Sequence, residues 1–141
     1  MSHKFAGHCQ CSEVQLSLSL PKHVDHYTPR ACDCDFCLSR DASYLSDPDG
    51  RLQITAFSPL NITKQGSEQA LFLSCARCCS LVAVVYPFTD GLKGAVNATF
   101  LSEVNHQRSI PVSPKQLSPD DKYRRWQDMW LTVSINGKNH L

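Results

Sequence analysis

Hydrophobic and polar residues alternate in two segments of the chain, which is the pattern of a β-strand with one buried face. The apolar positions are Val14, Leu16, Leu18 and Leu20 in the first segment, and Leu52, Ile54 and Ala56 in the second, which spans 51–57. A turn at 47–50 precedes the second segment, because its proline and glycine favour a chain reversal. Two further apolar runs, 71–73 and 81–86, predict a hairpin around the cysteine group at 75–79.

Helical signals are concentrated near the end of the chain. Ser118 is followed by Pro119 and two acidic residues, which is typical of a helix N-terminus. Tyr123, Trp126 and Trp130 then recur at helical spacing. The pattern therefore predicts a mainly β protein with one short C-terminal helix.

Length and charge limit the class of protein further. The chain has 141 residues and a formal net charge of +1, so we expect a single domain, 1–141. No basic arm or acidic tail is present, and we predict no nucleic-acid partner. The longest apolar run, 81–86, is far too short for a membrane span, so no membrane partner is predicted. The first residues lack the apolar core of a secretion signal, and we expect a cytoplasmic protein.

The basic and aromatic residues at 122–126 have two interpretations. Arginines and aromatic rings together are able to contact single-stranded nucleic acid. A helix with a solvated basic face and an aromatic core face explains the same residues, and we favour this second interpretation.

The cysteines fall into three groups, which are Cys9 and Cys11, then Cys32, Cys34 and Cys37, then Cys75, Cys78 and Cys79. A disulfide framework is typical of small secreted domains, and cysteines this close in sequence rarely have the geometry to bridge one another. Grouped thiolates instead direct several sulfur ligands at one metal ion. We therefore predict zinc, with two ions expected.

Four of the cysteines predict a closed structural zinc site. Cys9 and Cys11 are two residues apart, and in an extended strand such residues face the same side. Cys75 and Cys78 supply the other half from a loop with two spacer residues. Four thiolates fill a tetrahedral site, so binding of this ion stabilises the fold. A version with Cys79 in place of Cys78 is also permitted by the spacing.

The middle group, Cys32, Cys34 and Cys37, predicts an open zinc site. Three protein ligands leave a fourth position for water or substrate, which is the pattern of a catalytic zinc. A substrate thiol suits that position because zinc deprotonates a coordinated thiol. The alternatives are an empty trio and a second closed structural site, whose fourth ligand would be Cys79, Asp35 or Asp33.

The three cysteine motifs resemble those of the glutathione-dependent formaldehyde-activating enzymes, a family grouped with centromere protein V. The family patterns G-x-C-x-C-G-x-V, C-x-C-S-x-C and F-x-x-C-x-x-C-G correspond to segments 7–14, 32–37 and 72–79 of this chain. Asn97-Ala98 and Trp126 fit the C-terminal pattern of the family. The resemblance thus extends over residues 3–130.

This resemblance implies both a fold and an activity. The implied fold is a β-tent of small packed antiparallel sheets, with structural zinc on the first and third cysteine groups and catalytic zinc on the middle trio. The implied activity is that of a carbon–sulfur lyase acting on a thiol–aldehyde adduct such as S-hydroxymethylglutathione. Its small-molecule partners would be a thiol, glutathione or another, and an aldehyde. The candidates for a general acid are unranked and are His8, His26 and Asp35.

The chain departs from the family pattern at several positions. Ser12 and Cys79 stand where the family usually has glycine, and a non-glycine residue at positive φ costs about 1–2 kcal/mol, so we expect reshaped turns there. Asp35 replaces a common serine, and Leu38-Ser39 stands where basic residues are common. Both changes disfavour an anionic thiol such as glutathione.

Two other functions remain open at the level of sequence. One is a zinc-stabilised binding module without catalytic activity, in which the trio is structural or empty. The other is a redox-sensing thiol protein, for which the adjacent pair Cys78-Cys79 would form reversible disulfides with the trio.

Overall fold

The computed structural model describes residues 3–23, 26–32, 42–57, 59–64, 70–101, 110–112 and 118–141. In these ranges the strands form one hydrogen-bonded network. Its strands are β1 (His3–His8), β2 (Val14–Leu20), β3 (Arg30–Cys32), β4 (Ser43–Leu45), β5 (Arg51–Ala56), β6 (Leu60–Lys64), β7 (Leu71–Cys75), β8 (Leu81–Phe88), β9 (Gly91–Asn97), β10 (Ile110–Val112) and β11 (Leu131–Ile135). The network consists of three small sheets that meet at β9.

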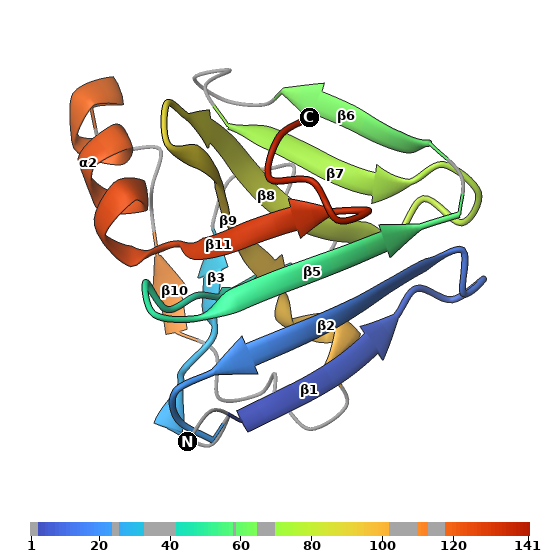
Figure 1. Ribbon diagram of the computed structural model, residues 1–141. Helices are drawn as coiled ribbons and strands as arrows, with labels where there is room; N and C mark the ends of the chain where they lie inside the picture. Colours follow the sequence, from blue (N-terminus) through green and yellow to red (C-terminus); the bar gives the residue numbers. More distant parts are fainter. Residues whose placement is uncertain are drawn as a thin grey trace.

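The first sheet has the order β1-β2-β5-β11, and Figure 1 shows these strands side by side. The hydrophobic residues that alternate along β2 are all buried, as the sequence predicts. Leu16 and Leu18 lie opposite Ile54 and Leu52 of β5, and all four are almost fully buried. Burial of each such side chain stabilises the fold by about 1.5–3 kcal/mol.

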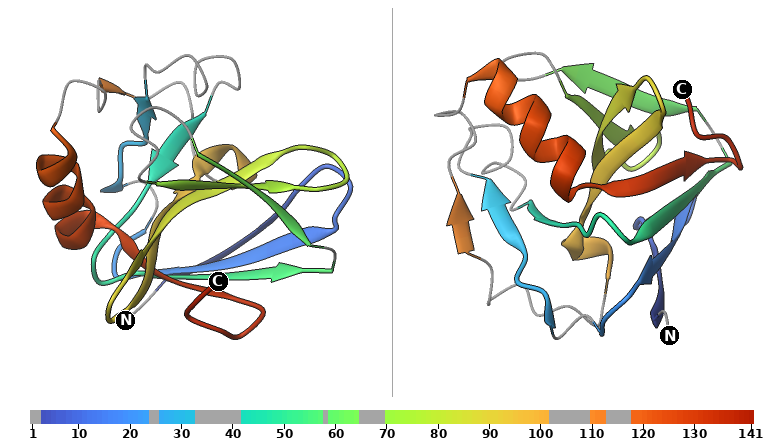
Figure 2. Two further views of the ribbon diagram at one scale, coloured as in Figure 1. Left: turned by 90° about the horizontal axis from the view of Figure 1, so that it is seen from above. Right: turned by 60° about the vertical axis from the view of Figure 1, so that its left-hand side comes forward.

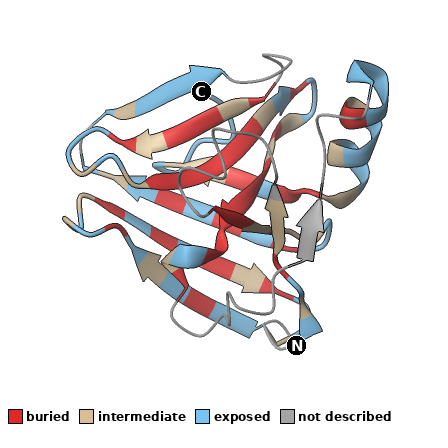
Figure 3. Cartoon of the chain, turned by 180° about the vertical axis from the view of Figure 1, so that it is seen from behind, coloured by how far each residue is buried: buried red, intermediate tan, exposed pale blue. Residues whose placement is uncertain are grey.

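The second sheet consists of β6, β7, β8 and β9 in antiparallel order. The hairpin formed by β7 and β8 surrounds the third cysteine group, which confirms the prediction from the two apolar runs. Figure 3 shows buried residues along β8 and β9, whereas the outer strand β6 is mostly exposed.

The strand β9 joins the second sheet to the other two. One edge of β9 pairs with β8 from Gly91 to Val96. The other edge pairs with β11 at Lys93 and Gly94 and with β4 at Val96 and Asn97. The third sheet continues from β4 to β3 and β10. Two of the pairs, β11 with β5 and β10 with β3, are parallel, so the network is mostly but not wholly antiparallel.

The helix α2 (Pro119–Met129) begins where the sequence predicts, with the Ser118 hydroxyl accepting a hydrogen bond from the Asp121 N–H at 3.1 Å. Its aromatic face packs on the second sheet, where the ring of Tyr123 meets that of Tyr86 at 5.6 Å. Trp126 and Trp130 stack at 4.7 Å, and Trp130 is buried. The interpretation of 122–126 as a helix with an aromatic core face is thus consistent with the packing.

One basic residue of α2 does not lie on a solvated face. Lys122 is only 8% exposed, whereas Arg124 and Arg125 are exposed. Figure 2 shows that α2 lies on the same side of the molecule as β3 and β10.

The prediction of a mainly β protein with small packed sheets and a short C-terminal helix is confirmed. In the ranges described above, no helix is long and apolar enough to cross a membrane.

Candidate metal centre

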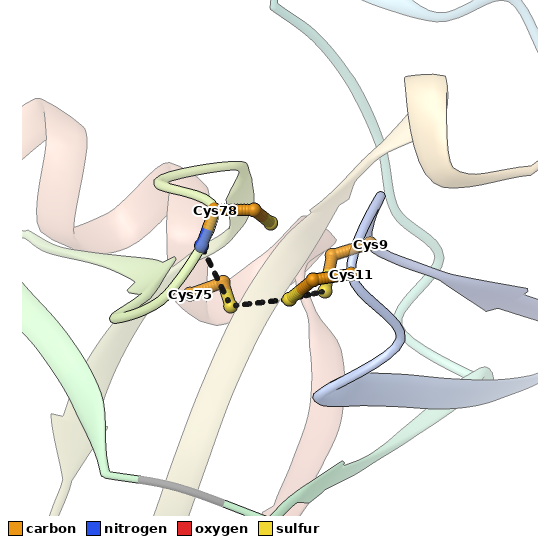
Figure 4. Close-up of side chains that lie close together, drawn as sticks. All are labelled: Cys9, Cys11, Cys75 and Cys78. Carbon is orange, nitrogen blue, oxygen red and sulfur yellow. Dashed lines mark hydrogen bonds between the residues drawn. The ribbon is translucent and has the colours of Figure 1, made fainter.

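Four cysteines gather where the turn between β1 and β2 meets the hairpin of β7 and β8. The sulfur atoms of Cys9, Cys11, Cys75 and Cys78 all lie within 4.8 Å of one another. The Cys11 Sγ is 3.5 Å from the Sγ of Cys9 and 3.5 Å from that of Cys75. Figure 4 shows the four side chains directed toward a common centre. The structure therefore brings together the same four residues that the spacing rules group into one site.

The first half of the cluster is a tight turn rather than the extended strand that the sequence argument assumes. The strand β1 ends at His8, and Cys9 and Cys11 flank the turn that follows. The Ser12 N–H donates to the Cys9 carbonyl at 3.0 Å, and the Cys9 N–H donates to the Val14 carbonyl at 3.0 Å. The expectation of an extended strand at Cys9–Cys11 is wrong, because these backbone bonds close a turn.

The second half of the cluster is the loop between β7 and β8. The Cys75 N–H donates to the Ser80 carbonyl at 2.9 Å, and the Cys79 N–H donates to the Cys75 carbonyl at 2.9 Å. The Cys75 sulfur accepts hydrogen bonds from the backbone N–H of Arg77 at 3.4 Å and of Cys78 at 3.5 Å. These hydrogen bonds hold the loop around the Cys75 sulfur.

Both loops keep the left-handed conformation at the positions where the family pattern has glycine. Ser12 has φ 62° and Cys79 has φ 63°, although neither is glycine. Each loop therefore carries the backbone strain of a non-glycine residue at positive φ. Whether the turns are reshaped relative to the family stays a prediction.

Two of the four thiols have strongly shifted pKa values. Burial opposes ionisation of Cys78, but hydrogen bonds from the Ser80 hydroxyl and from backbone N–H groups outweigh it and lower the pKa of Cys78 to about 5. The backbone hydrogen bond with Glu13 favours the Cys11 thiolate, but burial and contacts with the neighbouring sulfurs raise the pKa of Cys11 to about 12. Binding of a metal ion by all four sulfurs would require Cys11 to lose its proton.

The cluster has the dimensions of a tetrahedral zinc site. Zinc–sulfur bonds of about 2.3 Å place the sulfurs of a tetrahedron roughly 3.8 Å apart. The Cys11 sulfur is 3.5 Å from two of the other sulfurs, and all four sulfurs lie within 4.8 Å of one another, so the cluster is of that size. Cys9 and Cys75 are almost fully buried, so water has little access to two of the ligands. Four thiolates leave no open position, and a metal ion held here would be structural.

A comparison of structures supports the fold. The crystal structure of a Rhodobacter sphaeroides protein, determined in a structural genomics programme, is similar with a TM-score of 0.56 and 23% sequence identity. The similarity covers 75% of this chain and 97% of that chain. At this identity the likeness shows the fold alone. No protein-family model and no curated protein matches the chain.

A cavity of about 390 Å³ lies beside the cysteine cluster. Its lining comes from the β1–β2 turn, the β7–β8 loop, β9 and the short 3₁₀ helix η2 (Ala98–Phe100), and it includes His8, Gln10, Cys79, Ser80, Asn97 and Thr99. The Asn97 side chain donates to the Leu81 carbonyl at 2.8 Å and accepts from the Thr99 N–H at 3.2 Å. Asn97 therefore fixes the wall that η2 contributes.

Close backbone packing also holds η2 in place. A Cβ atom added at Gly7 would collide with the carbonyl oxygen of Phe100. Only glycine therefore lets the end of β1 approach η2 this closely, which explains the glycine of the first motif.

The structure places the other predicted site residues less completely. Cys32 ends β3, where its backbone pairs with Val112, but its side chain lies outside the described residues. Cys34 and Cys37 and the candidate ligands Asp33 and Asp35 lie entirely outside the described residues. Cys79 is exposed and lines the cavity, and the cluster contains Cys78 instead.

The structure describes two of the candidate acids, His8 and His26, and one residue near the cluster that the sequence argument missed. His8 lines the cavity and its Nδ1 donates to the Cys9 carbonyl at 2.8 Å, whereas His26 is exposed and lines no part of it. Ser80, which sequence reasoning missed, has its Oγ 3.1 Å from the Cys78 sulfur. Its position directly after the third cysteine group is the sequence signal that points to it.

Proposed function

We propose that the protein is a zinc-dependent carbon–sulfur lyase that forms and cleaves a thiol–aldehyde adduct, like the glutathione-dependent formaldehyde-activating enzymes that its motifs resemble. The observation that carries the proposal is the cluster of Cys9, Cys11, Cys75 and Cys78, because two of the three motifs meet there at zinc-binding distances. The third motif, Cys32, Cys34 and Cys37, would hold the catalytic zinc. When bound, that ion supplies a Lewis acid with an open position that deprotonates a substrate thiol.

The register of the third sheet supports a shared site for the trio and the cavity. Arg30 of β3 pairs with Tyr44 of β4, and Tyr44 pairs with Asn97 of β9. Cys32 ends β3 two residues after Arg30, so at the usual strand spacing its backbone lies roughly 12 Å from Asn97, which lines the cavity. A small adduct held in the cavity would lie near the end of β3, where the trio begins.

The residues of the cavity supply binding and proton transfer in this proposal. Gln10, Ser80 and Thr99 offer polar groups to the adduct, while Asn97 keeps the wall rigid. Because the Cys9 carbonyl only accepts hydrogen bonds, the Nδ1 of His8 must be the donor in the contact between them. In this tautomer Nε2 carries no proton and is free to accept one, and His8 lines the cavity, so His8 is better placed than His26 for proton transfer.

The reaction balances with one proton. In the forming direction the thiol gives up its proton, the thiolate sulfur attacks the aldehyde carbon, and a C–S bond forms as the π bond of the carbonyl breaks. The carbonyl oxygen takes up the proton that the thiol lost and becomes a hydroxyl. In the cleaving direction the hydroxyl loses this proton, the carbonyl π bond re-forms, the C–S bond breaks, and the proton returns to the released thiolate. Holding both reactants in one cavity removes much of the entropic cost of their encounter.

The test is an adduct-exchange assay on the zinc-loaded chain. Exchange of ¹³C-labelled formaldehyde with glutathione is followed by NMR for the wild type and for Cys34→Ala. We expect the wild type to accelerate exchange and the variant to lose that acceleration while keeping the zinc of the four-cysteine cluster. Full activity in Cys34→Ala would contradict the mechanism. A wild-type protein that holds one zinc and forms no adduct would instead be a zinc-stabilised binding module.

A further inference from the structure

An ion pair joins the two loops that carry the four-cysteine cluster. Glu13 lies in the turn between β1 and β2, two residues after Cys11. Arg77 lies in the loop between β7 and β8, directly before Cys78. The Arg77 Nη1 donates to the Glu13 Oε1 at 3.0 Å. Figure 4 shows these two loops facing each other across the sulfur atoms, so the pair connects the two halves of the metal centre a second time.

The backbone of the same two residues contacts the sulfur ligands. The Arg77 N–H donates to the Cys75 sulfur at 3.4 Å, and the Glu13 N–H donates to the Cys11 sulfur. These two sulfurs come from opposite loops and are 3.5 Å apart. Groups that hydrogen-bond to metal ligands hold the ligands in place for the ion. The ion pair therefore links the two residues whose N–H groups orient neighbouring ligands on opposite loops.

Both partners of the pair are held by the surrounding backbone. The Glu13 carbonyl accepts a hydrogen bond from the Phe57 N–H at 2.9 Å, just after the end of β5. The Cys79 N–H donates to the Cys75 carbonyl at 2.9 Å, which closes the loop that contains Arg77. The Glu13 side chain is only 25% exposed, whereas that of Arg77 is 70% exposed. Formation of the pair therefore orders mainly the arginine side chain.

The pair and the cavity lie at different ligands of the cluster. Cys9 and Cys78 line the cavity, whereas Cys11, Cys75 and the two residues of the pair do not. Cys75 is almost fully buried and Cys11 is half-buried. A molecule that takes the metal ion away must displace sulfur ligands, and separation of Cys11 from Cys75 moves the two loops apart. This movement stretches the ion pair, because the pair joins the same two loops.

We propose that the Glu13–Arg77 pair is a latch that slows release of the metal ion from the four-cysteine cluster. Both are positioning residues in this role, since neither belongs to the group of metal ligands. On release the ion passes to the acceptor with its charge unchanged, and the thiolates left behind take protons from the solvent. The latch goes beyond the proposed lyase activity and does not depend on it, because it concerns only the four-cysteine cluster.

The test is the rate at which the zinc-loaded full chain passes zinc to an excess of the coloured chelator pyridylazoresorcinol. All proteins carry Cys34→Ser, so that an ion on the middle trio does not contribute, and the chain with this change alone is the reference. Glu13→Gln and Arg77→Gln should each accelerate release about threefold, the size expected of an exposed ion pair. The double variant should release zinc no faster than the single variants, because the second substitution removes an interaction that is already lost. Arg124→Gln, which changes an exposed arginine of α2, is the matched control and should release zinc at the reference rate.

Cobalt absorption separates a latch from a change in the metal ligands. The cobalt-substituted variants should keep the thiolate-to-cobalt absorption of the reference, because all four sulfurs still bind the ion. Release at the reference rate by both single variants, effects that add in the double variant, or equal acceleration by Arg124→Gln would overturn the latch. A changed cobalt spectrum would also overturn it, because the pair would then set the ligand geometry rather than the release rate. The adduct-exchange assay tests the lyase separately, so failure of the latch leaves the lyase intact.

Discussion

At the scale of single residues, Ser12 and Cys79 adopt a backbone conformation that favours glycine. Each adopts positive φ directly after a cysteine of the cluster, at Cys11 and at Cys78. This conformation ends the metal-binding turn and redirects the chain into the next strand. Glycine adopts it without steric cost, whereas serine and cysteine do not.

Replacement of these residues by glycine should stabilise the protein. We expect Ser12→Gly and Cys79→Gly each to raise the free energy of unfolding by about 1 kcal/mol, since relief of steric strain exceeds the added entropy of the unfolded chain. Urea denaturation of the zinc-loaded protein measures the change.

Gln10→Gly is the matched control for these two substitutions. Gln10 lies in the same turn as Ser12, is exposed and has no positive φ. Glycine there should lower the free energy of unfolding by about 0.5–1 kcal/mol, through backbone entropy alone. Equal destabilisation by all three glycine variants would contradict the explanation by strain.

Tyr27 provides a prediction for pH dependence. Burial and the hydrogen bond that its hydroxyl donates to Asp47 at 2.7 Å raise the pKa of Tyr27 to about 12. The unfolded value is about 10, so the folded state retains the proton more strongly. The stabilising contribution is therefore complete below pH 10 and is lost as the pH rises from 10 to 12.

The variant Tyr27→Phe isolates this contribution. Urea midpoints at pH 9 and pH 11 should fall less between the two values in Tyr27→Phe than in the wild type. Ionisation of other groups affects both proteins alike and cancels in the comparison. An equal fall in both proteins would show that Tyr27 is not protected in the fold.

At the scale of elements, the four-cysteine cluster connects the first sheet to the second. Cys9 and Cys11 belong to the turn of β1 and β2, while Cys75 and Cys78 belong to the hairpin of β7 and β8. Metal binding at this point makes the stability of each sheet depend on the other. Loss of a ligand should therefore lower the stability of the whole domain.

Cys11→Ser should release the structural metal and lower the free energy of unfolding by at least about 3 kcal/mol. The same loss should follow treatment of the wild type with a strong chelator. Thermal unfolding combined with a colorimetric zinc assay measures both effects. Cys79→Ser is the control, because Cys79 is exposed and lies outside the cluster, and it should retain the metal. Retention of the metal and of wild-type stability by Cys11→Ser would contradict the role of the cluster.

Elements with regular patterns could be predicted from the sequence, and elements without them could not. The alternation of β2 and β5, the hairpin of β7 and β8, and the start of α2 all follow from local residue patterns. The strand β9 lacks such a pattern because it contains Gly91 and Gly94 and is buried on both faces over much of its length. It is held in the sheets by its neighbours rather than by its own preference for a strand.

At the scale of the whole molecule, the grouping of Cys9, Cys11, Cys75 and Cys78 was predictable and its surroundings were not. Cysteines two or three residues apart indicate a metal site even when two such pairs are far apart in sequence, because few other kinds of site use cysteines at this spacing. The cavity has no comparable local pattern. It depends on how the β1–β2 turn, the β7–β8 loop, β9 and η2 come together, and only the folded structure supplies this arrangement.

The most direct test of the proposed lyase site is a zinc count by native mass spectrometry on the wild type, Cys34→Ser and Cys11→Ser. We predict two zinc ions in the folded wild type, one in Cys34→Ser, and unfolding with loss of zinc in Cys11→Ser. The ion missing from Cys34→Ser should be the one that exchanges with added small thiols in the wild type. A wild-type protein with a single zinc, or two ions retained in Cys34→Ser, would contradict an open zinc site at Cys32, Cys34 and Cys37.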